Sequence, residues 1–415
     1  MPPPDSVTSL GPLHLLWRLL PTRQRRALLA RATALLAPRP DRAPPPPRGG
    51  VVVAGELTRA SGLGEAARLM QRAIAGLGVP VWPVDIGTPL SREAPPAPPP
   101  GAVPEGAPLL LHANAPVLPW ALLRLPRGLV RGRRVIGYWA WELPAVPDSW
   151  RIGLGFVHEI WALSHFTAEA FRAWLPAGSG VVVRTVPVPV AVSPPEPSPL
   201  DRAAFGLPES AVIVLVSFSL ASSNVRKNPL GAVRAFRTAF GDRSDRILLL
   251  KVGDCGHFPA EFAALRDLVV GCPNIRLETR TLPRADNHAL TACADIVLCL
   301  HRSEGFGLVP AEAMLLGRPV IATGWSGNMD FMDADSAALI GYRLVEARDP
   351  RGVFEAPGAV WAEPDLGEAA AALVALADDE TARVALGVRG QALARARLGA
   401  GPVAAALGAL GLAAP

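Results

Sequence analysis

The sequence predicts an α/β protein built from two Rossmann-like domains whose parallel sheets face each other across a cleft. Short runs of β-branched and aliphatic residues alternate with helical stretches in both halves of the chain. Continuous apolar strands separated by helices are typical of parallel sheets that are covered on both faces. The chain has 415 residues, half of them apolar, which is too long for one typical domain.

We expect five regions in chain order. Residues 1–49 form a basic, proline-rich extension, and residues 50–192 form the N-terminal Rossmann-like domain. The proline-rich stretch 193–210 divides the folded chain almost in half and is expected to be the linker. Residues 211–385 then form the C-terminal Rossmann-like domain, and 386–415 a helical segment expected to pack back on the N-terminal domain.

Each domain is predicted from its apolar runs. Those of the first half are 51–55, 81–86, 109–114, 134–141, 160–164 and 181–188, and those of the second half are 211–219, 246–253, 275–280, 295–300 and 319–323. In such sheets ligands bind where the carboxyl ends of the strands lead into helices. We therefore looked for functional residues at these points.

The N-terminal extension accounts for the net positive charge of the chain. Residues 1–50 contain eight arginines against Asp5 and Asp41, a net charge of +6 in a chain whose total is +5. The rest of the chain is close to neutral, which argues against nucleic-acid binding. Two interpretations of the extension remain open: a poorly ordered arm, or a basic amphipathic segment that contacts anionic lipid through residues 10–37.

The cysteines and the N-terminus indicate the compartment. Cys255, Cys272, Cys293 and Cys299 have spacings that match no metal or redox motif, so we interpret them as buried thiols in a reducing environment. The N-terminal segment has neither the length of a membrane span nor the order of charges of a secretory signal. We expect a cytoplasmic protein, peripheral on the cytoplasmic face of the inner membrane if the extension binds lipid.

Two glutamates flank a glycine turn in the stretch SEGFGLVPAEAMLLGRPVIAT. Glu304 falls in the loop after an apolar strand, and a helix is expected to begin near Pro310, which places Glu312 in its first turn. Gly305 and Gly307 leave room for a ligand near the backbone, and the helix start offers unpaired N–H groups to a phosphate. The simpler alternative is that Glu312 complements the helix dipole and Glu304 is a solvated loop charge.

A basic pair follows another strand. Only two of the 41 basic residues are lysines, and Lys227 stands directly beside Arg226. An arginine gives bidentate phosphate contacts and a lysine a point charge. This pair therefore predicts a diphosphate site, and the alternative is a solvated cluster at a helix start.

A glycine-rich turn, SGLGEAA, opens a helix in the first domain. Together with Asp85 it imitates a dinucleotide-binding fingerprint, which favours a dinucleotide-dependent oxidoreductase as a rival function. However, Gly62 lies seven residues past Gly55, which is too far for that turn. We instead expect Gly62 and Gly64 to let the backbone approach a ligand from this side of the cleft.

Other polar residues stand at strand ends. His112 and Asn114 follow one strand and Glu142 another, so all three are expected to face the cleft as catalytic or hydroxyl-binding groups. For His112 the alternative is a buried histidine with a structural role. Asp333 and Asp335 form a D-x-D pair that follows no suitable strand. We expect neither a metal nor a cofactor.

These motifs carry a resemblance. EGFGLVPAEAMLLGRPVIATGWSGNMDFM resembles the glutamate-x7-glutamate region of retaining glycosyltransferases of the group 1 (family four) type, which have the GT-B fold. The resemblance implies that Glu304 contacts the donor sugar and Glu312 the nucleotide ribose. It also implies that sugar and phosphate contact the residues between them, which are Gly305, Phe306, Gly307 and Leu308.

The resemblance covers roughly residues 50–380. SFSLASSNVRKNPLGAVRAF resembles the family's diphosphate-binding segment, and GYWAWELPAVPDSW and HEIWALSHFTAEAF resemble acceptor-domain strands of bacterial members that build surface polysaccharides. It implies an acceptor domain at 50–192, a nucleotide-sugar donor domain at 211–385, and metal-independent transfer with retention by front-face attack. The acceptor would be a saccharide or a lipid-linked saccharide. A sugar-nucleotide epimerase with the same fold is a further alternative, although no added acid–base set is visible.

Overall fold

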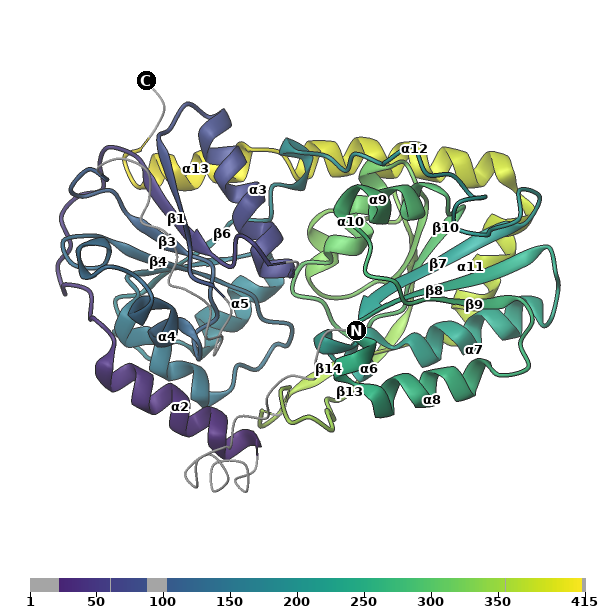
Figure 1. Cartoon of the computed structure of the whole chain (residues 1–415), viewed down its shortest axis with the longest axis horizontal. Coiled ribbons are helices and arrows are strands. Elements are labelled where there is room, and N and C mark those ends of the chain that lie inside the picture. The colour runs from purple at the N-terminus through teal and green to yellow at the C-terminus, as the bar shows by residue number, and fades with distance from the viewer. Residues whose placement is uncertain (1–21, 60, 88–102, 355, 413–415) are drawn as a thin grey trace, which may run out of the picture.

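The computed structural model describes residues 22–59, 61–87, 103–354 and 356–412. Two six-stranded sheets lie side by side, with helices packed around each of them (Figure 1). Every strand pair within these two sheets is parallel. The predicted α/β class with two Rossmann-like sheets is confirmed.

The N-terminal sheet has the strand order β2-β1-β3-β4-β5-β6. Its strands are β1 Val51–Gly55, β2 Val81–Asp85, β3 Leu109–Leu111, β4 Val135–Trp139, β5 Glu159–Ala162 and β6 Val182–Thr185. Its helices are α3 Gly62–Gly76, α4 Leu118–Leu123 and α5 His165–Trp174, with a 3₁₀ segment over Asp148–Phe156. All five residues of β1, and all those of β3, β4 and β5, are buried, as expected for strands that are covered on both faces.

The C-terminal sheet has the order β12-β11-β10-β7-β8-β9. Its strands are β7 Val212–Ser219, β8 Arg246–Gly253, β9 Ile275–Glu278, β10 Ile296–Cys299, β11 Val320–Thr323 and β12 Ala338–Ile340. Its helices are α6 Asn224–Lys227, α7 Pro229–Phe240, α8 Pro259–Val269, α9 Arg284–Ala292, α10 Leu308–Leu315 and α11 Leu366–Asp378. A separate antiparallel ribbon pairs β13 Tyr342–Glu346 with β14 Val360–Pro364.

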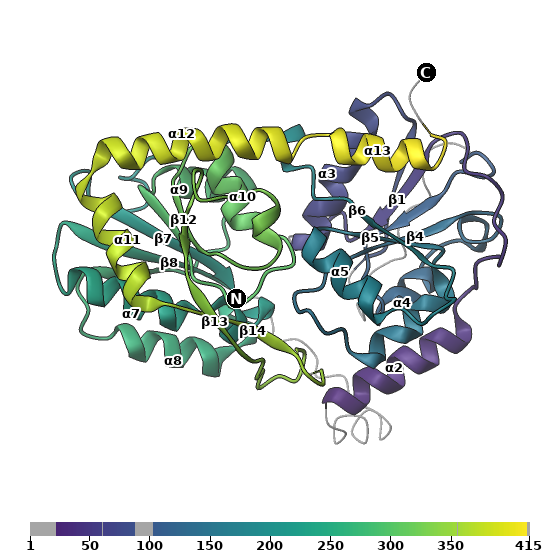
Figure 2. The same ribbon diagram turned by 180° about the vertical axis from the view of Figure 1, so that it is seen from behind.

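The C-terminal helices connect the two domains. Helix α12 (Glu380–Arg397) packs against α10, and α13 (Gly401–Ala409) packs against α3 of the N-terminal domain. Figure 2 shows the two helices following one another along one edge of the molecule. The turn between them also bonds to the other domain, because the N–H of Ala191 donates to the carbonyl of Leu398 at 3.0 Å.

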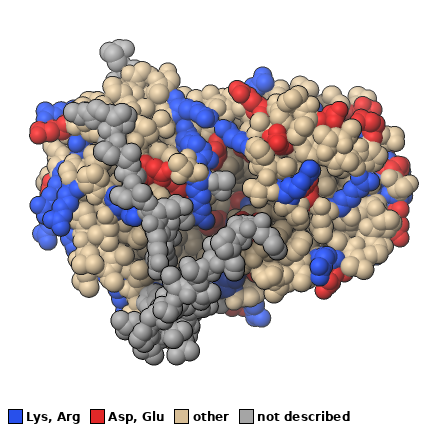
Figure 3. Space-filling view, in the orientation of Figure 1, with Lys and Arg blue, Asp and Glu red and all other residues tan. Residues whose placement is uncertain are grey.

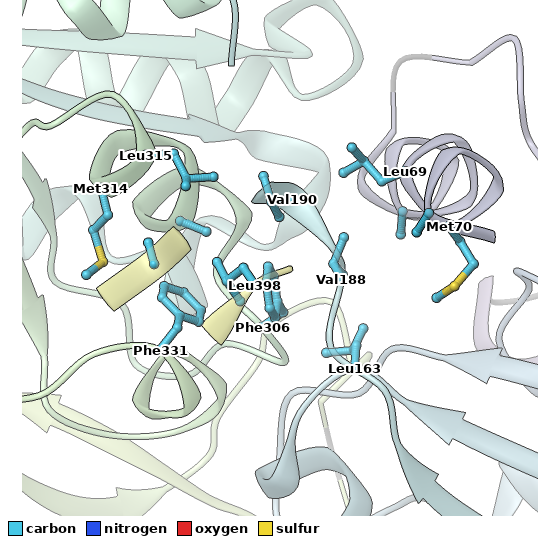
Figure 4. Packing of buried hydrophobic residues seen from close by; sticks show 14 of the residues in the cluster. Leu69, Met70, Leu163, Val188, Val190, Phe306, Met314, Leu315, Phe331 and Leu398 are labelled. Carbon is cyan, nitrogen blue, oxygen red and sulfur yellow. The ribbon is translucent and has the colours of Figure 1, made fainter. Parts of the chain in front are cut away.

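One hydrophobic cluster continues across the domain boundary. It joins side chains of the N-terminal domain and the linker entry to side chains of the loop after β10 and of elements that follow this loop in the chain (Figure 4). The members on the first side include Leu69, Met70, Leu163, Val188 and Val190, and those on the other include Phe306, Met314, Leu315, Phe331 and Leu398. The loop that carries Glu304 is therefore packed between the two domains.

The described part of the N-terminal extension begins with a helix and has no regular secondary structure over residues 37–49. Helix α2 (Thr22–Leu36) packs on α4 and on the 3₁₀ segment Asp148–Phe156. The predicted lipid-contact segment falls partly outside the described residues, because its first part precedes residue 22. None of the helices that the structure describes is long and apolar enough to cross a membrane.

The four cysteines are all free thiols, but only Cys272 is buried. The interpretation of all four as buried is therefore wrong: Cys255, Cys293 and Cys299 are partly exposed. Cys255 and Cys293 lie at element ends, where the sheet no longer covers them, rather than inside a strand.

Candidate functional site

The loop after β10 brings Glu304 into the molecule rather than into solvent. Only 8% of Glu304 is exposed. Its carboxylate accepts a short hydrogen bond from Nζ of Lys227 and lies 3.3 Å from Nη1 of Arg226. Burial on its own would raise the pKa of Glu304, but Lys227 and Arg226 outweigh it and lower the pKa to about 2. A solvated loop charge, the simpler alternative, does not describe this residue.

The basic pair is presented by a single helical turn, α6. Ser223 caps this turn with a positive φ of 70°, and Asn228 ends it in the left-handed region. The side chain of Asn228 also donates to the carbonyl of Leu300 at 2.9 Å, which ties the turn to the end of β10. Asparagine tolerates the left-handed conformation better than bulkier residues do, so Asn228 suits the end of the turn that presents Arg226 and Lys227 to the Glu304 loop.

Arg226 is held by backbone carbonyls. Its Nη1 donates to the carbonyl of Ser303 at 2.7 Å and its Nη2 to that of Ser222 at 2.9 Å, while the guanidinium lies 5.4 Å above the ring of Phe354. The residue is only 3% exposed. These contacts leave the guanidinium little freedom, so it is a fixed positive charge at the domain boundary.

The helix after this loop begins earlier than predicted. Helix α10 starts at Leu308, directly after Gly307, whose φ of 98° is open only to glycine at low cost. The prediction of a helix start near Pro310 is therefore wrong, and Glu312 lies in the second turn instead of the first. Pro310 is accepted inside the first turn because N–H groups there have no helical partner.

The same loop is fastened to the N-terminal domain. The carbonyl of Gly305 accepts hydrogen bonds from Oγ of Ser164 at 2.6 Å and Oγ1 of Thr167 at 3.2 Å. Oγ of Ser303 donates to the carbonyl of Glu142. Ser164 and Thr167 lie within the stretch HEIWALSHFTAEAF, but the sequence did not single them out, because a helix N-cap does not show what its side chains contact in another domain. These hydrogen bonds hold the loop after β10 directly against the N-terminal domain.

A cavity of about 990 Å³ opens beside this contact. It brings together three predicted residues, Asn114, Glu142 and Arg226. Its remaining walls include aromatic and basic side chains from α2, the N-terminal loops and the β13–β14 connection, namely Arg31, Trp141, Trp150, Arg351 and Phe354. Figure 3 shows a hollow between the two domains with Lys and Arg side chains beside it.

Glu142 and Asn114 both line this cavity but have different partners: Glu142 lies near a cation, and Asn114 is bonded to the backbone. Oε1 of Glu142 lies 4.0 Å from Nη2 of Arg226, and burial raises the pKa of Glu142 while Arg226 opposes the rise. Oδ1 of Asn114 accepts from the N–H of Ala140 at 2.8 Å, so this amide joins the ends of β3 and β4. The pKa of Glu142 is thus raised, whereas that of Glu304 is lowered.

His112 does not reach the cavity, and the expectation that it faces the cleft is wrong. The residue is 1% exposed and its ring stacks on Tyr138 at 4.4 Å. Among the described residues neither ring nitrogen has a hydrogen-bond partner. Burial lowers the pKa of His112 to about 3, so the imidazole is a neutral core group at physiological pH.

The glycine turn of the first domain opens α3. Gly64 has a packing role, because a Cβ there would lie 2.5 Å from the carbonyl of Glu56, whereas a Cβ at Gly62 would meet open space. Asp85 accepts from the N–H groups of Thr58 at 3.0 Å and Gly87 at 2.7 Å. Asp85 is therefore already used to hold loops, which disfavours a dinucleotide-ribose role for it.

Glu312 lies apart from the basic pair. The atom facing its Oε1 is Nε2 of His288 on α9, at 3.5 Å. Of the predicted donor residues, Phe306 is 5% exposed and packs on Phe331, so only its backbone is available to a ligand. No group of metal-ligand side chains occurs among the described residues, and Asp333 instead accepts from the N–H of Asp335 within a turn.

Known proteins resemble this chain in its C-terminal sequence and its fold. Residues 213–362 match the family described as "Glycosyl transferases group 1". HepE from Anabaena, solved with UDP and glucose, is 14% identical with a TM-score of 0.59, and the match covers 87% of this chain and all of HepE. Sucrose-phosphate synthase from Thermosynechococcus elongatus is 16% identical, with a TM-score of 0.58 and coverage of 88% of this chain and 98% of that one.

TarM from S. aureus, solved with UDP, is 11% identical with a TM-score of 0.52. The match covers 73% of this chain, which spans only 55% of TarM. No curated protein sequence is significantly similar to this chain. The solved structures establish the predicted GT-B fold.

Proposed function

We propose that this chain is a retaining glycosyltransferase that moves a sugar from a nucleotide-sugar donor to a saccharide or lipid-linked saccharide, in the biosynthesis of a cell-surface polysaccharide. The observation that carries the proposal is the buried cluster of Glu304, Arg226 and Lys227 beside the interdomain cavity. The match to group 1 glycosyl transferases and the UDP bound in the HepE and TarM structures support the class of donor.

In this proposal the donor lies along the C-terminal domain. Arg226, Lys227 and the N–H groups at the start of α10 take the diphosphate, since cations and a helix N-terminus both favour anions. Glu304 takes hydroxyls of the donor sugar, and Glu312 takes those of the ribose. Gly62 and Gly64 approach the donor or the acceptor from the opposite domain.

The acceptor enters the interdomain cavity, whose polar lining includes Asn114 and Glu142. The acceptor oxygen forms a bond to the anomeric carbon, and the bond from this carbon to the diphosphate oxygen breaks. The acceptor proton passes to the departing phosphate on the same face of the sugar, which retains the anomeric configuration. The fixed charges of Arg226 and Lys227 stabilise the negative charge of the leaving diphosphate without a metal ion.

Helix α2 supports contact with a membrane surface. Three of its leucines are exposed, namely Leu28, Leu35 and Leu36, of which Leu35 is 83% exposed, and the exposed Arg31 of the same helix also lines the interdomain cavity. Apolar side chains next to a cation suit the boundary of an anionic bilayer. We therefore propose a cytoplasmic enzyme that binds peripherally, which co-sedimentation with phosphatidylglycerol vesicles, but not phosphatidylcholine vesicles, would test.

The first test of the proposed function is which nucleotides the protein binds. Thermal-shift assays should show stabilisation by UDP or GDP and none by NAD or NADP, and a response to NAD alone would overturn the proposal. A screen of nucleotide sugars then identifies the donor from nucleotide release that depends on an acceptor.

Glu304→Gln should lower transfer at least about 100-fold, the scale of losing one positioned electrostatic group. The matched control is Glu169→Gln, an exposed glutamate on α5. If Glu304→Gln keeps transfer within about tenfold of the wild type while the fold is intact, the placement of the donor site is wrong.

A further inference from the structure

His288 is a buried histidine between the interdomain linker and Glu312. The residue is 5% exposed and projects from α9. On one side its Nε2 lies 3.5 Å from Oε1 of Glu312. On the other side its Nδ1 lies 3.1 Å from the backbone nitrogen and 3.3 Å from the backbone oxygen of Glu196. Both ring nitrogens therefore face polar groups.

The chemistry of the imidazole decides where its proton lies. If Nδ1 accepts the N–H of Glu196, the ring is neutral and its proton is on Nε2, facing Glu312. If the ring is protonated, Nδ1–H donates to the carbonyl of Glu196 and Nε2 again carries a proton. The remaining tautomer would turn a lone pair toward a carboxylate and is disfavoured. Glu312 thus faces an N–H donor in both favourable states.

The distance of 3.5 Å is long for a full hydrogen bond, but a charged acceptor is still attracted to a donor at this range. Among the described residues, His288 is the only ion-pair partner assigned to the side chain of Glu312. The contact restrains one carboxylate oxygen and leaves the other to accept from a ligand.

We infer that His288 is a positioning residue that orients Glu312 for the ribose of the donor, and that the backbone of the linker holds His288 in place. The inference rests on the proposed function, because it needs a ribose at Glu312. The linker is itself fixed to both domains: Nη1 of Arg72 on α3 donates to Oγ of Ser193, and the N–H of Ser198 donates to the carbonyl of Ala285 on α9. A shift of the linker would therefore move His288, and through it Glu312.

Two substitutions at His288 separate its two contacts. The amide of His288→Asn takes the place of Nδ1 and keeps the linker contact, but it has no group at the position of Nε2. The longer His288→Gln places an amide N–H near the position of Nε2 and so keeps a donor for Glu312. The control is His158→Asn, because the ring of His158, in the described part of the chain, bonds to the backbone groups of Val135 and Asp41 and to no ligand-binding candidate.

The readout is the ratio of dissociation constants for UDP and 2′,3′-dideoxy-UDP, measured by calorimetry, or the corresponding GDP pair if GDP is the nucleotide bound. Wild-type protein, His288→Gln and His158→Asn should prefer the ribose form by about tenfold or more, the scale of a hydrogen bond to a charged group. His288→Asn and Glu312→Gln should reduce the preference to about twofold or less, with binding of the dideoxy nucleotide unchanged.

The outcomes distinguish the ribose role of Glu312 from the positioning role of His288. A wild-type protein that binds neither nucleotide, or does not distinguish the dideoxy form, contradicts the proposed ribose role of Glu312. If Glu312→Gln loses the preference but His288→Asn keeps it, His288 does not position Glu312 and the inference fails. If both His288 variants weaken UDP and the dideoxy form equally, the effect is on the fold, and the inference fails as well.

Discussion

Gly305→Ala tests whether sugar transfer requires the loop after β10 to contact the N-terminal domain. A Cβ at Gly305 would lie 2.8 Å from the carbonyl oxygen of Trp141 and 3.2 Å from Cδ1 of Leu163. The leucine methyl can rotate away, but the carbonyl is backbone and also accepts from Oγ1 of Thr167 at 2.9 Å. Something in this contact must therefore shift.

Forcing an extra methyl group into packed surroundings costs about 1–3 kcal/mol. Because the clash exists only where the loop meets the N-terminal domain, we expect the cost to oppose this contact rather than the fold of either domain. About 2 kcal/mol corresponds to roughly 30-fold in an equilibrium. We expect kcat to fall by about this factor, while the affinity for the nucleotide diphosphate, which contacts mainly the other domain, changes less than about threefold.

The assay combines initial rates of transfer, calorimetric binding of UDP or GDP, and the radius of gyration from small-angle scattering, which should increase. Gly155→Ala is the matched control, because its Cβ would meet nothing within 4 Å. The reasoning is refuted if Gly305→Ala keeps kcat within about twofold, or if nucleotide affinity falls as much as kcat.

Three further predictions follow from the charges of the site. Lys227→Met should raise the donor KM about 10- to 100-fold, whereas Lys251→Met, at a lysine that donates to the carbonyl of Arg280, should leave it unchanged; equal effects would refute the diphosphate role. The pKa of Glu304 is about 2, against an ordinary value of 4.5. The ionised carboxylate therefore contributes about 3 kcal/mol to the free energy of unfolding above about pH 4.5, and this contribution is lost as the pH falls toward 2. Urea unfolding should thus show the stability of Glu304→Gln approaching that of the wild type in acid, and a constant difference would contradict the ion pairs. Chelation by EDTA should leave the initial rate unchanged, and a loss restored by Mg²⁺ would refute metal-independent transfer.

The strands were predictable because buried parallel strands are continuous apolar runs. All those predicted are present, although the run at 109–114 forms a strand only over Leu109–Leu111. The sequence did not indicate β12, β13 or β14. Four of the five residues of β13 are exposed, so it lacks an apolar run, and β12 has only three residues. Short or solvent-facing strands are specified by their partners rather than by their own sequence.

The site was predictable where adjacent residues create it and not where tertiary packing does. The basic pair and Glu304 are each marked by local sequence, and the structure brings them into contact. His112 follows an apolar strand just as a ligand-binding residue would, and only its stacking on Tyr138 shows that it belongs to the core. His288 lies in a helix without any motif, and it meets Glu312 only because α9 packs beside α10.

The Glu304–Gly305 pair shows how one short loop can link the two halves of the proposed reaction. The side chain of Glu304 contacts cations of the C-terminal domain, while the next carbonyl, that of Gly305, accepts hydrogen bonds from Ser164 and Thr167 of the N-terminal domain. Separating the domains would break these bonds and free the backbone that holds Glu304. In the proposed mechanism, the group that positions the donor sugar is therefore fully ordered only while the acceptor domain is in place, which favours transfer to the acceptor over hydrolysis by water.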